Sequence, residues 1–263
     1  GLMSLEPQTG HIKAWVGGID YKFFQYDHVG QGARQVGSTF KPFVYATAIE
    51  QLGMSPCDSI IDSPFMIHKG RHHVTADWEP KNSDRQYRGM VTLKRALALS
   101  INTVSAKLID KTGPEAVVNL TKKLGVNSEI PVQPSIALGA VEITVEDMVA
   151  AYSTFANQGV YVKPLFISRI EDKNGKVLEE FFPTTDEVSS EEKAYAMIQL
   201  MRGVVDRGTG SRLRSRYNLR NEIAGKTGTT QNNADGWFMG LTPDLVAGCW
   251  VGGEERSVHF NST

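Results

Sequence analysis

The chain has 263 residues, of which 41% are hydrophobic and 22% charged, which is typical of a globular protein with one sizeable core or two modest domains. Its formal net charge of −1 gives no reason to expect a nucleic-acid partner. No apolar run reaches the roughly 18 residues of a membrane span, and the sequence shows no signal peptide. Cys57 and Cys249 form no disulfide framework and lack metal-ligand spacing. Because the chain opens in strand-like sequence without an initiator Met, we expect a fragment of a longer protein.

Residues 2–19 predict a β-hairpin, because two apolar runs flank a turn-forming Pro/Gly cluster. Residues 20–37 are aromatic and Gly-rich with little periodicity, which predicts a loop. Apolar residues then recur with helical spacing, so we expect a helix from Ser38 to near Gly53.

That helix starts with a serine and a lysine three residues apart, Ser38 and Lys41, which are neighbours on one helix face. A lysine can take the proton of a serine if burial or nearby cations hold the amine partly neutral. The helix N-terminus, fixed close to Ser38 by Pro42, would add backbone N–H groups where an oxyanion forms. Taken alone, the pair is also explained by an N-cap serine followed by a solvated lysine.

Residues 54–90 are rich in Pro, Asp and Asn and are predicted to be irregular. They contain His68, His72, His73 and Asp77, but this spacing supports no metal site. We interpret the segment as a loop that borders a cleft.

A helical pattern over residues 92–110 is interrupted by Ser100-Ile101-Asn102. On an unbroken helix, residues i and i+2 point about 200° apart. If Ser100 and Asn102 serve one site, the helix must break there, and both residue types favour turns. The spacing alone leaves open an unbroken helix with a polar face.

The middle of the chain predicts two further helices and a hairpin. Residues 114–124 form a short helix, and residues 126–143 form a loop. The next helix starts at Thr144, where Asp147 completes a capping box. Residues 161–180 suggest a strand pair around an Asn-Gly turn.

Ser189 and Glu192 form another capping box and predict a helix that ends at Gly208 or Gly210. The arginine-rich residues 207–220 that follow favour a solvated loop, with an anionic polymer as the alternative partner.

The last part of the chain predicts three short strands: 222–230, 236–240 and 245–251. Side chains alternate along a strand, so Lys226 and Gly228 share one face. Glycine there removes a side chain where another element or a ligand must come close. Lys226 then offers a fixed cation, and Thr227 and Thr229 offer hydroxyls, which together suit a carboxylate.

Three motifs thus follow one another along the chain: Ser38-x-x-Lys41, Ser100-x-Asn102 and Lys226-Thr227-Gly228. In this order they resemble the penicillin-binding transpeptidases of bacterial cell-wall synthesis. The similarity covers nearly the whole chain, and four segments look like the bifunctional, class A branch: 34–43, 87–93, 224–230 and 235–243.

The resemblance implies an α/β (α+β) fold with a central antiparallel sheet of about five strands, formed by the N- and C-terminal segments and packed with helices. An all-helical subdomain would adjoin the sheet, with the active site at their junction. Residues 1–263 would be one transpeptidase domain, without the glycosyltransferase domain and membrane anchor that precede it in the family. We also expect the C-terminal helix that covers the sheet to be missing, so that an apolar sheet face is exposed.

The resemblance also implies a chemistry. Ser38 would attack the penultimate carbonyl of a D-Ala-D-Ala stem peptide, and an amine on a neighbouring stem would later take the acyl group. Lys41 would accept the serine proton, while Ser100 and Lys226 relay a proton to the leaving amine. Asn102 would orient Lys41 and the substrate amide.

Substrate binding is expected from the third motif, Thr227, Gly228 and Thr229, whose threonines would hold the terminal carboxylate. The backbone N–H groups of Ser38 and Thr229 would form the oxyanion hole. A β-lactam would enter as a substrate mimic and acylate Ser38. The family uses no metal or other cofactor. It works in the bacterial cell envelope, outside the cytoplasmic membrane in the periplasm or at the cell surface, and reaches the membrane only through the parent protein's anchor.

Two other functions stay open. One is a non-catalytic β-lactam sensor or scaffold, although the presence of every motif residue argues against an inactive scaffold. The other is a hydrolase, either a D,D-carboxypeptidase or a β-lactamase. Ile101 replaces the Asp of the class A β-lactamase pattern, and only Glu142 and Glu146 are candidates to activate a deacylating water. We therefore expect stable acylation and favour a transpeptidase. The identity of the acylation base stays open.

Overall fold

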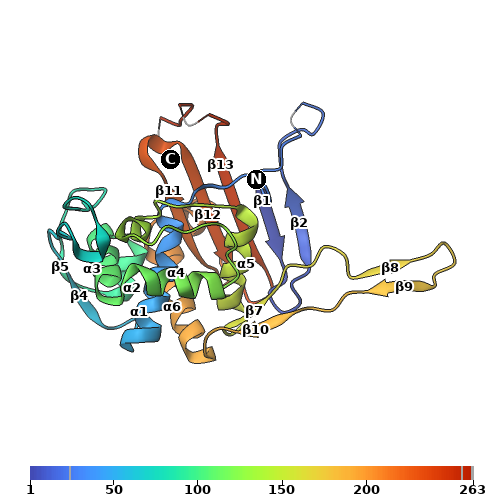
Figure 1. The fold of residues 1–263 in the computed structure, drawn as a ribbon, viewed down its shortest axis with the longest axis horizontal. Coiled ribbons are helices and arrows are strands. Elements are labelled where there is room, and N and C mark those ends of the chain that lie inside the picture. Colours follow the sequence, from blue (N-terminus) through green and yellow to red (C-terminus); the bar gives the residue numbers. More distant parts are fainter. Residues whose placement is uncertain (24, 256, 262–263) are drawn as a thin grey trace.

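The computed structural model describes residues 1–263 except 24, 256 and 262–263. Its centre is an antiparallel sheet of five strands in the order β11-β12-β13-β1-β2 (Figure 1). The strands are β1 (Leu2–Leu5), β2 (Ile12–Val16), β11 (Ala224–Thr229), β12 (Asp235–Leu241) and β13 (Val246–Gly252). The two ends of the chain therefore build one sheet, and the predicted fold class is confirmed.

The sheet buries one face against helices. Along β12, buried and partly exposed residues alternate, so that Trp237 and Met239 point inward. The helices on this side are α5 (Val145–Ala156) and α6 (Glu191–Arg207), with α1 (Lys41–Leu52) packed against α6. The opposite face carries exposed apolar side chains on three strands: Leu2, Val16 and Val251.

Helix α1 forms the middle of the core, because its residues from Lys41 to Ile49 are all buried. It follows a 3₁₀ turn, Gly37–Phe40, and ends at Gly53, whose φ of 62° is left-handed. The predicted helix from Ser38 is thus present, but Ser38 itself lies on the 3₁₀ turn.

The helical part beside the sheet contains α2 (Leu93–Ala98), α3 (Asn102–Thr112) and α4 (Pro114–Lys123). The chain breaks between α2 and α3 at Ser100, which has a φ of 56°. This confirms the predicted break, and the alternative of one unbroken helix is wrong.

Three segments predicted as loops or irregular structure, residues 20–37, 54–90 and 126–143, contain short paired strands. Residues 54–90 include β4 (Ser59–Asp62), which pairs with β5 (Gly89–Thr92), and the 3₁₀ turn Arg71–His73. Residues 126–143 include the 3₁₀ turn Pro134–Leu138 and β6 (Glu142–Ile143), which pairs with β3 (Arg34–Gln35). These strands have two to four residues each, too few for a periodic pattern.

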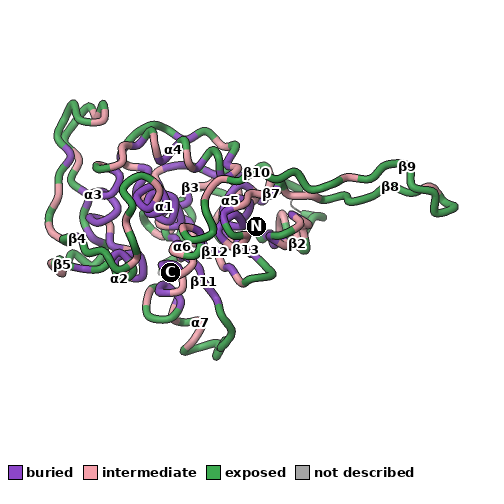
Figure 2. The backbone as a smooth tube through the Cα atoms, turned by 90° about the horizontal axis from the view of Figure 1, so that it is seen from below, coloured by how far each residue is buried: buried purple, intermediate pink, exposed green. Residues whose placement is uncertain are grey.

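The predicted strand pair is confirmed as β8 (Arg169–Glu171) and β9 (Val177–Glu180), a hairpin whose strands are fully exposed and project from the body (Figures 1 and 2). At its base, β7 (Val160–Val162) pairs with β10 (Thr185–Glu187).

The helix predicted to start at Ser189 starts one residue later. Ser190 is the N-cap of α6, because its hydroxyl accepts from the N–H of Lys193, whereas the Ser189 hydroxyl donates to Glu50. The helix ends at Arg207, directly before Gly208, which is one of the two predicted ends. The short helix α7 (Arg212–Ser215) follows. Within the described part of the chain, no helix is long and apolar enough to cross a membrane.

Candidate active site

A groove of about 970 Å³ runs between β11 and the helical part of the molecule. The 3₁₀ turn before α1 contributes Ser38, the turn between α2 and α3 contributes Ser100, and β11 contributes Thr227, Gly228 and Thr229. The three motifs therefore meet in one groove although they are distant in the sequence.

Ser38 lies on a turn whose backbone is held from several sides. Before it, the N–H of Gly37 donates to the carbonyl of Gly139 over 3.2 Å. After it, the buried hydroxyl of Tyr152 donates to the carbonyl of Thr39 over 2.6 Å. Ser38 is half-buried and lines the groove. Among the described residues, no hydrogen bond joins its hydroxyl to Lys41.

Lys41 is fully buried at the start of α1 and points to the second motif. Its Nζ donates to the Ser100 carbonyl over 2.6 Å, to Asn102 Oδ1 over 2.6 Å and to Ser100 Oγ over 3.1 Å. An ammonium has three N–H donors, so these acceptors account for all of them.

Lys226, also fully buried, reaches the same serine from β11. Its Nζ donates to Ser100 Oγ over 3.0 Å and to the Thr227 carbonyl over 2.9 Å. The Ser100 hydroxyl thus lies between two lysine amines. The left-handed backbone of Ser100 is uncommon for a residue other than glycine, and such conformations cluster at functional sites.

Burial changes the acidity of both lysines. It lowers the pKa of Lys226 to about 7. The pKa of Lys41 falls well below its usual 10.5, first because of burial and then because of the charge of Lys226. Among the described residues, neither lysine has a carboxylate partner that would oppose this shift. A lysine with a lowered pKa can be neutral near pH 7 and can then accept a proton.

The third motif touches the serine turn through two glycines. A Cβ on Gly228 would lie 2.7 Å from the carbonyl oxygen of Val36. A Cβ on Gly37 would lie 2.7 Å from the carbonyl oxygen of Thr229. Another element therefore comes close at Gly228, as predicted. This contact brings the backbones of Ser38 and Thr229 together at the groove. Thr229 is exposed, and the Thr227 hydroxyl is 2.5 Å from that of Thr209.

The family model of the penicillin binding protein transpeptidase domain matches residues 1–247. The chain belongs to this family. It is 42% identical over 254 residues to penicillin-binding protein 1A of Aquifex aeolicus, covering 95% of this chain and 34% of that protein. The corresponding protein of Neisseria lactamica is 38% identical over 258 residues, covering 95% of this chain and 32% of that protein. The chain thus spans about a third of the length of these curated relatives.

Solved structures of the penicillin-binding family have the same fold. Penicillin-binding protein 1A from Haemophilus influenzae superposes with a TM-score of 0.91 at 27% identity, covering 98% of this chain and 43% of that chain. PonA1 from Mycobacterium tuberculosis in complex with penicillin V superposes with a TM-score of 0.82 at 28% identity, covering 97% of this chain and 69% of that chain.

The two glutamates considered for a hydrolytic penicillin-binding enzyme lie elsewhere. Glu142 is exposed on β6 opposite Gln35, and Glu146 is in the first turn of α5, where burial raises its pKa. In the described part of the chain, neither residue lines the groove.

Residues 54–90, predicted to be a loop that borders a cleft, do contribute to the groove wall, through Asn82 and Arg88. Thr209 and Arg212 also line the groove, which the sequence did not predict. The carbonyl of Lys81, next to Asn82, accepts from Asn102 Nδ2 over 2.8 Å. For Arg88 the sequence gives a second signal, because residues 87–93 belong to a segment typical of the penicillin-binding family.

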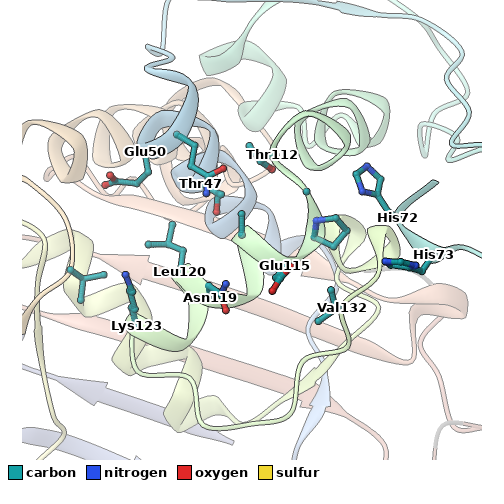
Figure 3. A pocket seen from close by; sticks show the side chains of 15 residues that line it. Thr47, Glu50, His72, His73, Thr112, Glu115, Asn119, Leu120, Lys123 and Val132 are labelled. Carbon is teal, nitrogen blue, oxygen red and sulfur yellow. The ribbon is translucent and has the colours of Figure 1, made fainter. Parts of the chain in front are cut away.

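A second cavity, of about 760 Å³, lies beside α4, away from the motifs (Figure 3). Its lining includes His72, His73, Glu115 and Asn119, and none of the motif residues. His72 is 3.1 Å from Asp110, while His68 pairs with Asp77 over 3.6 Å. In the described residues, no group of His, Cys, Asp or Glu side chains is arranged to hold a metal ion.

Proposed function

We propose that this chain is a serine D,D-transpeptidase that cross-links peptidoglycan stem peptides through an acyl-enzyme on Ser38. The observation that carries the proposal is the Ser100 hydroxyl held 3.1 and 3.0 Å from two buried lysine amines beside Ser38. Membership of the transpeptidase family supports the reaction class.

In the first half-reaction, Ser38 Oγ attacks the penultimate carbonyl of a D-Ala-D-Ala stem while neutral Lys41 takes its proton. The backbone N–H groups of Ser38 and Thr229 stabilise the oxyanion, where each such donor is typically worth about 3–4 kcal/mol. The C–N bond then breaks, and terminal D-alanine leaves with a proton relayed through the Ser100 hydroxyl from Lys226. Asn102 keeps Lys41 oriented through its 2.6 Å hydrogen bond.

In the second half-reaction, an amine of a neighbouring stem attacks the acyl-enzyme and forms the new amide as the ester bond to Ser38 breaks. The amine gives its proton to Lys226 through the Ser100 hydroxyl, and Lys41 returns its proton to Ser38. The Thr227 and Thr229 hydroxyls, next to the cation of Lys226, bind the terminal carboxylate of the donor. A β-lactam acylates Ser38 in place of the donor. Residues 1–263 would act as the transpeptidase domain of a longer, membrane-anchored envelope protein that also carries a glycosyltransferase domain, on the outer side of the cytoplasmic membrane.

The test is the mass of the intact protein after exposure to penicillin, followed for hours. We expect one adduct per chain that persists, and no adduct on Ser38→Ala. Ser59→Ala, a change of an exposed serine on β4, should be labelled like the unchanged chain. An adduct on Ser38→Ala would show that another residue is the nucleophile. Many turnovers of nitrocefin per chain would identify a hydrolase, and acylation without transfer to an added amine would identify a sensor.

A further inference from the structure

Helix α3, which carries Asn102, is capped by a residue from a distant loop. The residue at its N-cap position is Ile101, whose side chain cannot accept a hydrogen bond from the free N–H groups of the first turn. Asn82 supplies the acceptor instead. Its Oδ1 accepts from the N–H of Asn102 over 3.0 Å and from that of Thr103 over 3.1 Å.

The other end of the Asn82 amide is fixed by a buried carboxylate. Asn82 Nδ2 donates to Asp62 Oδ1 and to the Gln86 carbonyl, each over 2.8 Å. Asn82 is 3% exposed and Asp62 1%. Asp62 also accepts from the Thr103 hydroxyl over 2.6 Å and from the N–H of Arg88 over 3.0 Å. These donors offset the cost of burying the charge, and they leave only one orientation for the Asn82 amide.

The same loop holds the side chain of Asn102. The Lys81 carbonyl accepts from Asn102 Nδ2 over 2.8 Å, so that Asn102 Oδ1 faces Lys41. Asn82 thus fixes the start of helix α3, and its neighbour Lys81 fixes the orientation of the Asn102 amide. The left-handed turn at Ser100, with both lysine contacts, directly precedes this start.

We propose that Asn82, held by Asp62, is a positioning residue for the second motif. It fixes the backbone from Ser100 to Asn102, and through it the contacts with Lys41 and Lys226. This inference rests on the proposed acyl-transfer function. Although Asn82 lines the groove, both polar atoms of its side chain are committed to protein partners, so its role is to hold the motif and not to bind substrate.

The test uses the isosteric variant Asn82→Asp, which places a carboxylate oxygen against Asp62. We expect the second-order rate constant for acylation by penicillin to fall about 10- to 100-fold, because a small displacement of reacting groups costs that much. Stopped-flow measurement should assign the loss to the acylation step, with the dissociation constant of the non-covalent complex unchanged. Long incubation should still give one adduct per chain.

Two further variants separate positioning from loss of stability. Val117→Ala, a change of a buried residue in α4, lowers stability without touching the second motif and should acylate at the normal rate. The reciprocal pair Asp62→Asn with Asn82→Asp restores a donor opposite an acceptor between the two side chains and should recover part of the lost rate. Asn82→Ala provides the same comparison if Asn82→Asp does not fold.

Each outcome bears on one claim. Normal acylation of Asn82→Asp, a loss confined to the dissociation constant, or an equal loss in Val117→Ala at matched melting temperature would each overturn the positioning role. Failure of the unchanged chain to form an adduct on Ser38 would instead overturn the proposed function.

Discussion

Lys41 and Lys226 both donate a hydrogen bond to the Ser100 hydroxyl, but their lowered pKa values do not have the same causes. The pKa of Lys41 falls well below its usual value because of burial, and the charge of Lys226 adds to this effect. Lys226 has a pKa of about 7 from burial alone, so near neutral pH it can still carry a proton. The pair can therefore divide the work, with one amine as base and the other as cation and proton donor.

This division predicts a bell-shaped pH dependence of the second-order acylation rate constant, which reports on the free protein. The rate should rise as Lys41 deprotonates, well below the usual lysine pKa of 10.5. It should fall above about pH 7, as Lys226 loses the charge that attracts the carboxylate. Labelling by fluorescent penicillin across the pH range measures both limbs.

Lys226→Arg is the control for the descending limb. Arginine stays charged throughout the accessible range, so the variant should be slower overall but should lose the fall above neutral pH. A rate for the unchanged chain that continues to rise well above pH 7 would contradict the assignment of the cation.

At the scale of the elements, the groove depends on how closely β11 approaches the turn before α1. The absence of a side chain at Gly228 allows this contact, since its Cβ would meet the Val36 carbonyl oxygen at 2.7 Å and Thr39 Cγ2 at 2.9 Å. Backbone atoms cannot rotate away as a side chain can, so one of the two elements would have to move.

Gly228→Ala should therefore separate Thr229 from Ser38 and lower the acylation rate constant by about 100-fold, with the chain still folded. The rate of covalent labelling and the melting temperature measure the two effects. Gly203→Ala, in α6, is the matched control, because its Cβ would lie 3.3 Å from the flexible Lys94 side chain and no closer than 3.6 Å to Ala98 or to the Lys94 carbonyl oxygen. Equal rates in the two variants would show that the close approach does not set the oxyanion hole.

The elements also show what sequence could predict. The break at Ser100 was predictable, because Ser100 and Asn102 can serve one site only if the helix is interrupted there. The structure shows this break. The partnership of Asp62 with Asn82 could not be predicted, because it joins residues 20 positions apart across a segment without periodicity. The β4–β5 ladder that presents Asp62 has four residues in each strand, and pairing at long range leaves no local pattern.

For the whole molecule, a site with two buried amines should reduce stability in exchange for reactivity. A lysine with a pKa lowered from 10.5 to about 7 is protonated in both the folded and the unfolded state below pH 7, where its burial is fully destabilising. Between these values the unfolded chain binds more protons, so this contribution makes the protein more stable as pH rises.

Replacing this amine should therefore stabilise the chain while removing its activity. We expect Lys226→Met to abolish acylation and to raise the melting temperature, by about 2–4 °C for each kcal/mol recovered. The gain should be largest below pH 7 and should shrink toward pH 10.5, above which the lysine is neutral in both the folded and the unfolded state. Lys176→Met, at an exposed position beyond β8, should leave the melting temperature unchanged at every pH. A gain for Lys226→Met that is absent, or that does not depend on pH, would mean that the buried amine is not held with a lowered pKa, and the proton relay through Ser100 would lose its donor.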